Sequence, residues 1–130
     1  MALRILILED NAPLIRQLRQ LLTTRGYEVR ETSSVATFLS TAAAERFDAC
    51  LLDLWLPDGN GLDAWATARQ GCRTPAILMT AHCTPEVARR AAALDMTALI
   101  PKPLDVPALL AALEAAAGPP RPRADDPGEA

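Results

Sequence analysis

Four short, almost wholly apolar segments recur along the chain, and a polar residue follows each of them, directly or, for the last, after one proline. They span residues 3–8, 49–52, 76–79 and 97–100. Runs of this length and composition predict β-strands that are buried on both faces, as in a parallel sheet. Ligands of open parallel sheets bind outside the carboxyl ends of the strands. We therefore expect one crevice to hold the residues that end these runs: Glu9, Asp10, Asp53, Thr80 and Lys102.

Amphipathic segments with helical spacing separate the predicted strands, and a more polar strand at residues 27–31 is expected nearer a sheet edge. Capping residues mark several helix starts: Ser34, Thr84 before Pro85, and Asp105. Residues 57–61 (PDGNG) predict a turn-rich loop. The last helix, capped by Asp105 and running to about residue 117, is expected to carry Val106, Leu109, Leu110 and Leu113 on one face. Strands alternating with helices predict a single α/β domain of (βα)5 type with a parallel sheet.

The bulk composition narrows the classes of function. A net charge of −3 offers no electrostatic footprint for direct nucleic-acid binding, and no apolar run approaches the length of a membrane span. Residues 1–8 resemble a strand rather than a signal peptide, so a cytoplasmic location is expected. The three cysteines form no CxxC pair and His82 is the only histidine, which predicts reduced thiols and no zinc site. From Gly118 the chain becomes proline-rich, so we expect a domain at 1–117 and a linker or disordered tail at 118–130.

The acidic residues of the crevice predict a site for a divalent cation. Glu9, Asp10 and Asp53 would be like charges in close contact, so the pKa of at least one is expected to rise unless a cation is present. Mg²⁺ prefers oxygen ligands, keeps several waters and often uses only one or two carboxylates. We interpret Asp10 and Asp53 as direct ligands and Glu9 as a ligand through water. The backbone carbonyl of Trp55 is expected to reach the same ion.

One carboxylate of this group is also a candidate nucleophile. A carboxylate that attacks a phosphoryl group forms an acyl phosphate, and positioning and charge neutralisation supply most of the catalysis. Asp53 is the best candidate because it ends the central strand and precedes a Pro/Gly-rich loop. Lys102 would offer a cation to the phosphoryl oxygens, and Thr80 would offer a hydroxyl donor.

Four motifs together resemble the receiver domain of two-component response regulators: ILILED, LLDLWLPDGNGL, AILMTA and IPKPLD. The resemblance covers about residues 3–117. It implies a flavodoxin-like parallel sheet of order 2-1-3-4-5 with helices on both faces, a bound Mg²⁺ and a cis bond between Lys102 and Pro103. It also implies phosphorylation of Asp53 by a sensor histidine kinase or phosphotransfer protein, slow dephosphorylation, and a transcriptional output. The face made by the fourth helix, fifth strand and fifth helix is the expected homodimer face.

The chain departs from the family pattern at Leu99, where an aromatic residue is usual. A switch that couples Thr80 to that aromatic side chain cannot operate here, so the switch is expected to be read out differently. One alternative is a stand-alone or phosphorylation-independent protein-interaction module. An aspartate-nucleophile phosphatase is disfavoured, since Trp55 replaces the second aspartate of those enzymes. Trp55 and His82 are either ordinary loop residues or neighbours of the phosphoryl group, with Trp55 limiting the access of water.

Overall fold

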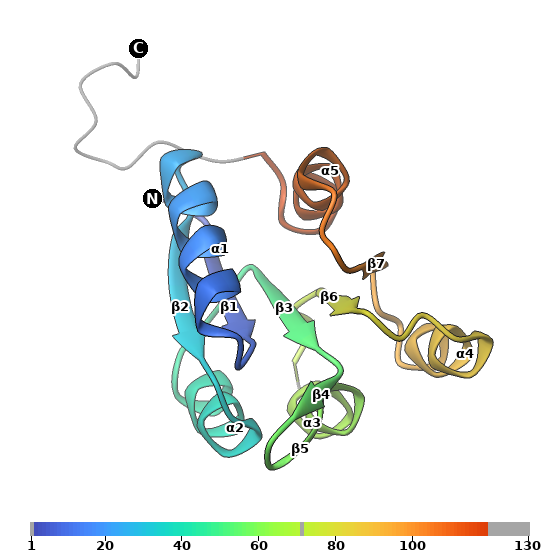
Figure 1. Ribbon diagram of the computed structural model, residues 1–130. Helices are drawn as coiled ribbons and strands as arrows, with labels where there is room; N and C mark the ends of the chain where they lie inside the picture. Colours follow the sequence, from blue (N-terminus) through green and yellow to red (C-terminus); the bar gives the residue numbers. More distant parts are fainter. Residues whose placement is uncertain (1, 71, 120–130) are drawn as a thin grey trace.

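The computed structural model describes residues 2–70 and 72–119, and a five-stranded parallel sheet forms its centre (Figure 1). The predicted tail at 118–130 therefore lies almost wholly outside the described residues. The spatial order is β2-β1-β3-β6-β7, which confirms the predicted order 2-1-3-4-5 and the edge position of the polar strand. The sheet strands are β1 (Arg4–Leu8), β2 (Glu28–Thr32), β3 (Ala49–Asp53), β6 (Ala76–Thr80) and β7 (Ala98–Pro101).

Five helices cover the two faces of the sheet (Figure 1). One face carries α1 (Ala12–Thr24) and α5 (Val106–Ala117), and the other carries α2 (Val35–Ala44), α3 (Gly61–Ala68) and α4 (Pro85–Ala93). The predicted caps are present, because the side chains of Ser34, Thr84 and Asp105 each accept a hydrogen bond from a backbone N–H of the helix that follows. These bonds satisfy donors that have no partner inside the helix.

The alternation of side chains along the strands divides the core into two layers. Ile5 and Ile7 of β1 pack with Leu18 of α1 and Leu109 of α5, whereas Leu6 and Leu8 pack toward Phe38 of α2. This is the pattern expected of strands that are buried on both faces. Within the described residues, no helix is both long enough and apolar enough to cross a membrane. The three cysteines are free thiols, and burial raises the pKa of the Cys50 thiol to about 12.

One residue on the apolar face of the last helix is not part of the core. Leu109 and Leu113 are fully buried, but the side chain of Val106 is 41% exposed. Val106 is the first residue of α5, where it borders an open groove beside α1 instead of contacting the sheet. Helical spacing gives the face on which a residue lies, but not how far the neighbouring helix extends along that face.

A small hairpin replaces the predicted loop after β3. It pairs β4 (Trp55–Leu56) with the antiparallel β5 (Gly59–Asn60). The backbone N–H of Gly61 donates to the carbonyl of Leu54 at 2.7 Å, and the chain passes so near β3 that a Cβ on Gly61 would lie 1.9 Å from the backbone oxygen of Asp53. Glycine at this position is therefore required by a close approach of two backbone segments.

The close approach at Gly61 makes a testable prediction. Gly61→Ala forces the backbone of Asp53 or of the hairpin to move, and overpacking of this kind costs about 1–3 kcal/mol. We expect a corresponding fall in the free energy of unfolding, measured by urea denaturation. The control is Thr67→Ala, an exposed position in the same helix, which should change stability little. Equal stability of the two variants would contradict the contact.

Candidate functional site

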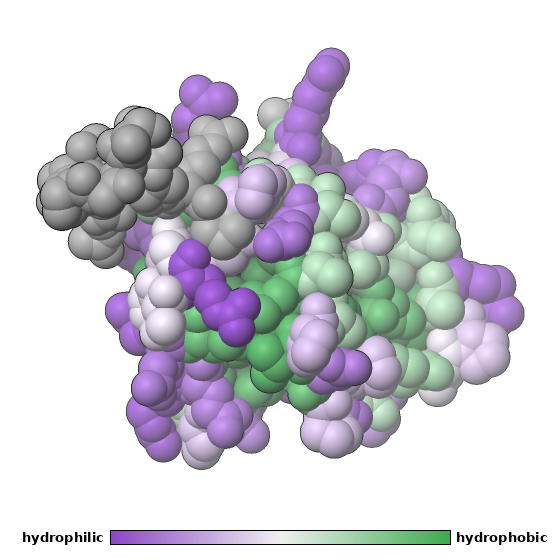
Figure 2. All heavy atoms as spheres, turned by 90° about the horizontal axis from the view of Figure 1, so that it is seen from above, coloured by the Kyte–Doolittle hydropathy of each residue, from purple (hydrophilic) through white to green (hydrophobic). Residues whose placement is uncertain are grey.

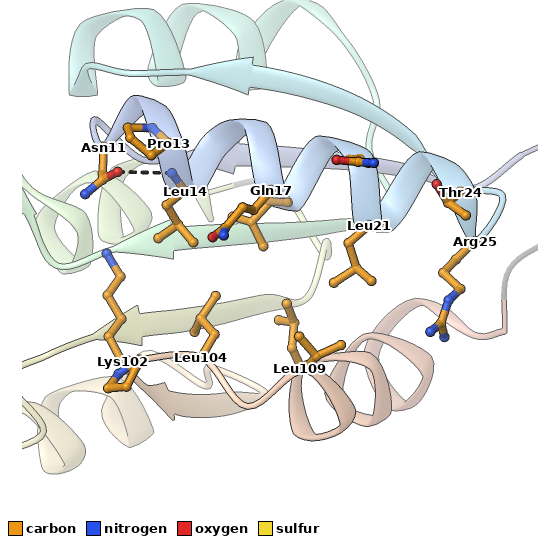
Figure 3. Close-up of a pocket in the computed structure, with 14 residues that line it drawn as sticks. Asn11, Pro13, Leu14, Gln17, Leu21, Thr24, Arg25, Lys102, Leu104 and Leu109 are labelled. Carbon is orange, nitrogen blue, oxygen red and sulfur yellow. Dashed lines mark hydrogen bonds between the residues drawn. The ribbon is translucent and has the colours of Figure 1, made fainter.

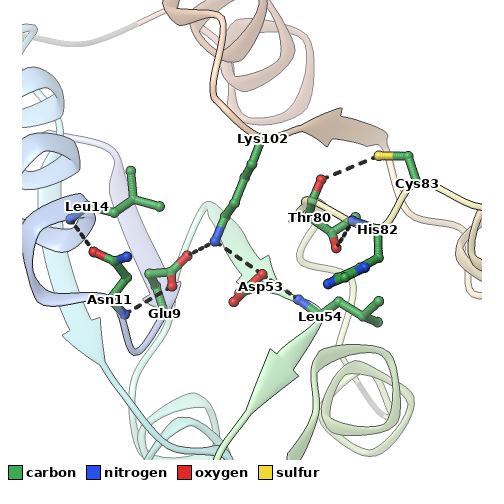
Figure 4. Close-up of polar contacts among 9 residues, drawn as sticks. All are labelled: Glu9, Asn11, Leu14, Asp53, Leu54, Thr80, His82, Cys83 and Lys102. Carbon is green, nitrogen blue, oxygen red and sulfur yellow. Dashed lines mark hydrogen bonds and ion pairs between the residues drawn. The ribbon is translucent and has the colours of Figure 1, made fainter.

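The register of the parallel sheet brings the acidic residues together. Leu8 of β1 pairs with Leu52 of β3, so Glu9 and Asp53 follow at the same edge of the sheet. Carboxylate oxygens of Glu9, Asp10 and Asp53 all lie within 4.8 Å of one another. Figure 4 shows Glu9 and Asp53 side by side at the carboxyl ends of the strands. The structure thus brings together the three acidic residues that the sequence predicted to meet.

Lys102 reaches into this acidic group from the segment after β7. Its Nζ lies 2.6 Å from Oε1 of Glu9 and 3.2 Å from Oδ1 of Asp53 (Figure 4). Its backbone N–H donates to the carbonyl of Thr80 at 2.9 Å, which ties this segment to the end of β6. The bond between Lys102 and Pro103 is cis, as expected from the family resemblance.

Charge and burial conflict at Glu9. Its side chain is fully buried, and desolvation raises the pKa of its carboxyl. The Asp53 carboxylate adds to the rise, while the Lys102 ammonium and the backbone N–H of Asn11 at 3.1 Å oppose it. A raised pKa was expected from the repulsion between carboxylates, but burial is the larger cause. Two unit charges 4.8 Å apart repel by about 3.5 kcal/mol at an effective dielectric constant of ~20, and one ammonium cannot neutralise three carboxylates.

The donor set of this cluster fits a hard divalent cation. It offers carboxylate oxygens from three residues, with Asp10 exposed to solvent and Asp53 only 9% exposed. Such oxygen ligands with access to water are what Mg²⁺ requires. Sulfur or imidazole ligands, which favour softer metals, are not part of the cluster as described.

The remaining predicted residues lie around the rim of the cluster. Thr80 is fully buried at the end of β6, and its hydroxyl oxygen accepts a hydrogen bond from the backbone N–H of His82 at 3.0 Å. Trp55 is 56% exposed, and its ring meets the His82 ring edge-on, with centroids 6.4 Å apart and an interplanar angle of 78°. The two aromatic rings that the sequence left with alternative roles are therefore direct neighbours.

Leu99 lies on β7, opposite Leu78 of β6. It is partly buried and packs against the core layer beneath α2, α3 and α4. Its side chain lacks the polar group that an aromatic tyrosine would carry, so it cannot form a hydrogen bond with Thr80. The coupling between Thr80 and an aromatic side chain, which the family pattern would suggest, is therefore not possible here, because leucine occupies this position of β7.

A groove that sequence reasoning missed begins beside Lys102. It has a volume of about 800 Å³ and runs between α1 and the segment from Lys102 to α5, with Arg25 at its far end (Figure 3). Leu14, Leu104 and Val106 contribute apolar side chains. Seen from above, the molecule shows a hydrophobic area that is bordered by polar side chains (Figure 2). The sequence carries no signal for this groove. The one indication of it is the exposure of Val106 at the start of α5, which only the folded structure shows.

Comparison with known proteins agrees with the fold. A family model for the response regulator receiver domain matches residues 5–114. The transcriptional regulatory protein KdpE of Mycobacterium tuberculosis is 35% identical over 114 residues, which are 86% of this chain and 50% of that relative. The response regulator ArlR of Staphylococcus epidermidis is 37% identical over 113 residues, 85% of this chain and 51% of that relative.

Solved structures give the same result. The non-phosphorylated HemR receiver domain from Leptospira biflexa is 30% identical, with a TM-score of 0.80 over 93% of this chain and 98% of that one. A CheY-like receiver domain from Methanospirillum hungatei is 26% identical, with a TM-score of 0.83 over 88% of this chain and 93% of that one. The chain belongs to the receiver domain family of two-component response regulators, in which accepting a phosphoryl group is the standard role. It spans about half the length of the curated relatives it matches.

The buried carboxyl of Glu9 predicts a pH dependence of stability. Its pKa in the folded chain lies above the ordinary value of 4.5, so the folded state binds this proton more tightly than the unfolded state. As pH rises from about 4.5 through the raised pKa, the Glu9 carboxyl should therefore lower the free energy of unfolding. Glu9→Gln removes this effect.

We expect the stability of Glu9→Gln relative to the parent to increase with pH across that window. The measurement is urea denaturation of both proteins in the presence of a chelator, from about pH 4.5 to about pH 7. A stability difference that stays constant with pH would contradict the burial of a charged Glu9.

Proposed function

We propose that this chain is a phosphoryl-accepting receiver in which Asp53 is the phosphoacceptor and Mg²⁺ is the required cation. The observation that supports it is the convergence of three carboxylates and Lys102 at the carboxyl ends of β1, β3 and β7. Asp10 and Asp53 would bind the ion directly, Glu9 through water, and Trp55 through its backbone carbonyl. The bound ion would neutralise charge on the phosphoryl oxygens.

The residues of the chain perform the transfer itself. An oxygen of Asp53 attacks the phosphorus of a phosphohistidine, the new O–P bond forms as the N–P bond breaks, and the imidazole leaves. Lys102 exchanges part of its pairing with Glu9 and Asp53 for the incoming oxygens. Thr80 donates its hydroxyl hydrogen to the phosphoryl group once it is bound. In the slow hydrolysis that ends the phosphorylated state, water attacks the phosphorus, the O–P bond to Asp53 breaks, and inorganic phosphate leaves as the Asp53 carboxylate is regenerated. The Trp55 and His82 rings limit the entry of that water.

The wider biological setting follows from the family. We propose that residues 1–117 are the receiver domain and 118–130 a linker or tail, and that the protein works in the cytoplasm with a sensor histidine kinase or phosphotransfer protein. Its output would be transcriptional, as it is for the relative KdpE, a transcriptional regulatory protein. A homodimer would use the face formed by α4, β7 and α5.

The direct test is intact-mass spectrometry after incubation with Mg²⁺ and a small-molecule phosphodonor. We expect the parent to gain one phosphoryl group and Asp53→Asn to gain none. Lys102→Ala should react about 100-fold more slowly, the usual cost of losing one group that stabilises developing charge. The matched control is Asp95→Asn, an exposed aspartate paired with Arg69, which should react like the parent.

Two results would contradict the proposal. Equal phosphorylation of the parent and Asp53→Asn would place the acceptor elsewhere. A folded parent that gains no phosphoryl group from either the small donor or a phosphorylated histidine-containing partner would favour the phosphorylation-independent interaction module. Leu99 is the residue that favours this alternative.

A further inference from the structure

The β4–β5 hairpin is too short to hold its own position. Each of its strands has two residues, and an isolated two-stranded hairpin is only marginally stable. Its pose beside the acidic cluster must therefore come from contacts with other elements. This matters because the hairpin begins at Trp55, two residues after Asp53, and carries the backbone carbonyl that the proposed cation site requires.

Two of the hairpin's attachments are local. The backbone N–H of Leu54 donates to Oδ1 of Asp53 at 2.9 Å, and the N–H of Gly61 donates to the carbonyl of Leu54 at 2.7 Å. At the other end, the side chain of Asn60 accepts hydrogen bonds from the first turn of α3. These contacts fix the two ends of the segment, and the buried Leu56 packs against the core, whereas the tip, residues 57–59, is exposed.

Asp58 attaches the tip of the hairpin to the start of α2. Its Oδ1 accepts from the backbone N–H of Val35 at 2.8 Å, and its Oδ2 accepts from that of Ala36 at 3.1 Å. These are the first two residues of α2, whose N–H groups have no acceptor inside the helix. The bonds from Val35 and Ala36 lower the pKa of the Asp58 carboxyl. An added Cβ on the neighbouring Gly59 would lie 3.2 Å from Cγ2 of Val35, so the tip also lies close against the helix.

The two hydrogen bonds that Asp58 accepts do more than cap α2. Ser34 already caps this helix by accepting from the N–H of Thr37 at 3.2 Å. Asp58 comes from 22 or more residues further along the chain and spans the gap between the helix and the hairpin. Because it is exposed and lies outside the acidic cluster, it can be changed without removing a ligand of the cation.

We propose that Asp58 is a positioning residue for the cation site, which acts by anchoring the β4–β5 hairpin to the N-terminus of α2 and so fixing the pose of Trp55. This inference rests on the proposed cation site. According to this proposal, the start of α2 supports the cation site although it carries no direct ligand of the cation. A change in the position of α2 would then alter cation binding at the far side of the hairpin.

The test measures Mg²⁺ binding itself, in the absence of any phosphodonor. Mg²⁺ is titrated into the protein and followed by tryptophan fluorescence, to which exposed Trp55 contributes. We expect Asp58→Ala to weaken binding by about 10-fold, the typical cost of losing a group that orients a metal ligand. Asp58→Asn keeps one acceptor oxygen and should fall between Asp58→Ala and the parent. Amide hydrogen exchange at Val35 and Ala36 should accelerate in the same order.

Two control variants separate positioning from other effects. Ser34→Ala removes the other cap of α2 and leaves the Asp58 anchor, so it should lower the melting temperature but bind Mg²⁺ like the parent. Asp63→Asn removes one exposed negative charge from α3, where its carboxylate pairs with Arg90, so it reports the general effect of charge. Equal weakening by Asp58→Ala and by either control would overturn the inference.

The outcomes also separate this inference from the function on which it depends. If the parent binds Mg²⁺ and Asp58→Ala binds it equally well, the positioning role is wrong and the receiver proposal stands. If the folded parent does not bind Mg²⁺ at all, both are wrong. Weakened binding in Asp58→Ala with an unchanged fold, measured by circular dichroism, supports both.

Discussion

The mutual repulsion of three carboxylates is the constraint on which this structure depends. Carboxylate oxygens of Glu9, Asp10 and Asp53 lie within 4.8 Å of one another, and among the described residues Lys102 is the cation that pairs with Glu9 and Asp53. The burial of Glu9 adds to the energetic cost of this repulsion, because desolvation penalises the charged form of its carboxyl. A divalent cation bound to these carboxylates would relieve this repulsion, and the cation together with Lys102 would then offset the negative charge of an incoming phosphoryl group.

The rest of the fold supplies the stability that this arrangement costs. Both faces of the sheet are covered by helices, and the apolar side chains of β1 and β3 alternate between two fully buried layers. The register of the parallel sheet holds Glu9 and Asp53 side by side, although their two carboxylates repel each other. Functional sites commonly retain such unfavourable interactions, and the surrounding packing offsets them.

Most of the fold could be predicted from local patterns. The alternation of apolar runs with capped helices is sufficient to give the (βα)5 arrangement, and the rule for ligand sites in parallel sheets places the acidic residues together. The β4–β5 hairpin could not be predicted, because two-residue strands have no periodicity and depend on a contact between Asp58 and a helix far away in sequence. The exposure of Val106 was missed for a related reason: it depends on how far α1 extends beside α5.

The site was predicted as a set of residues but not as a network. The sequence indicates that Lys102 lies near the acidic group, yet it does not indicate that Glu9 is fully buried or that the backbone N–H of Asn11 helps to hold it. The contact between the Trp55 and His82 rings also requires the folded structure, because the two residues follow different strands.

The most direct test of this account is the melting temperature of the parent and of Asp53→Asn, each measured with a chelator and with saturating Mg²⁺. The account predicts that, in the chelator, Asp53→Asn melts a few degrees above the parent, because it removes repulsion with Glu9 and Asp10. It also predicts that Mg²⁺ raises the melting temperature of the parent by more than that of the variant. An Asp53→Asn protein that is less stable in the chelator and equally stabilised by Mg²⁺ would contradict it.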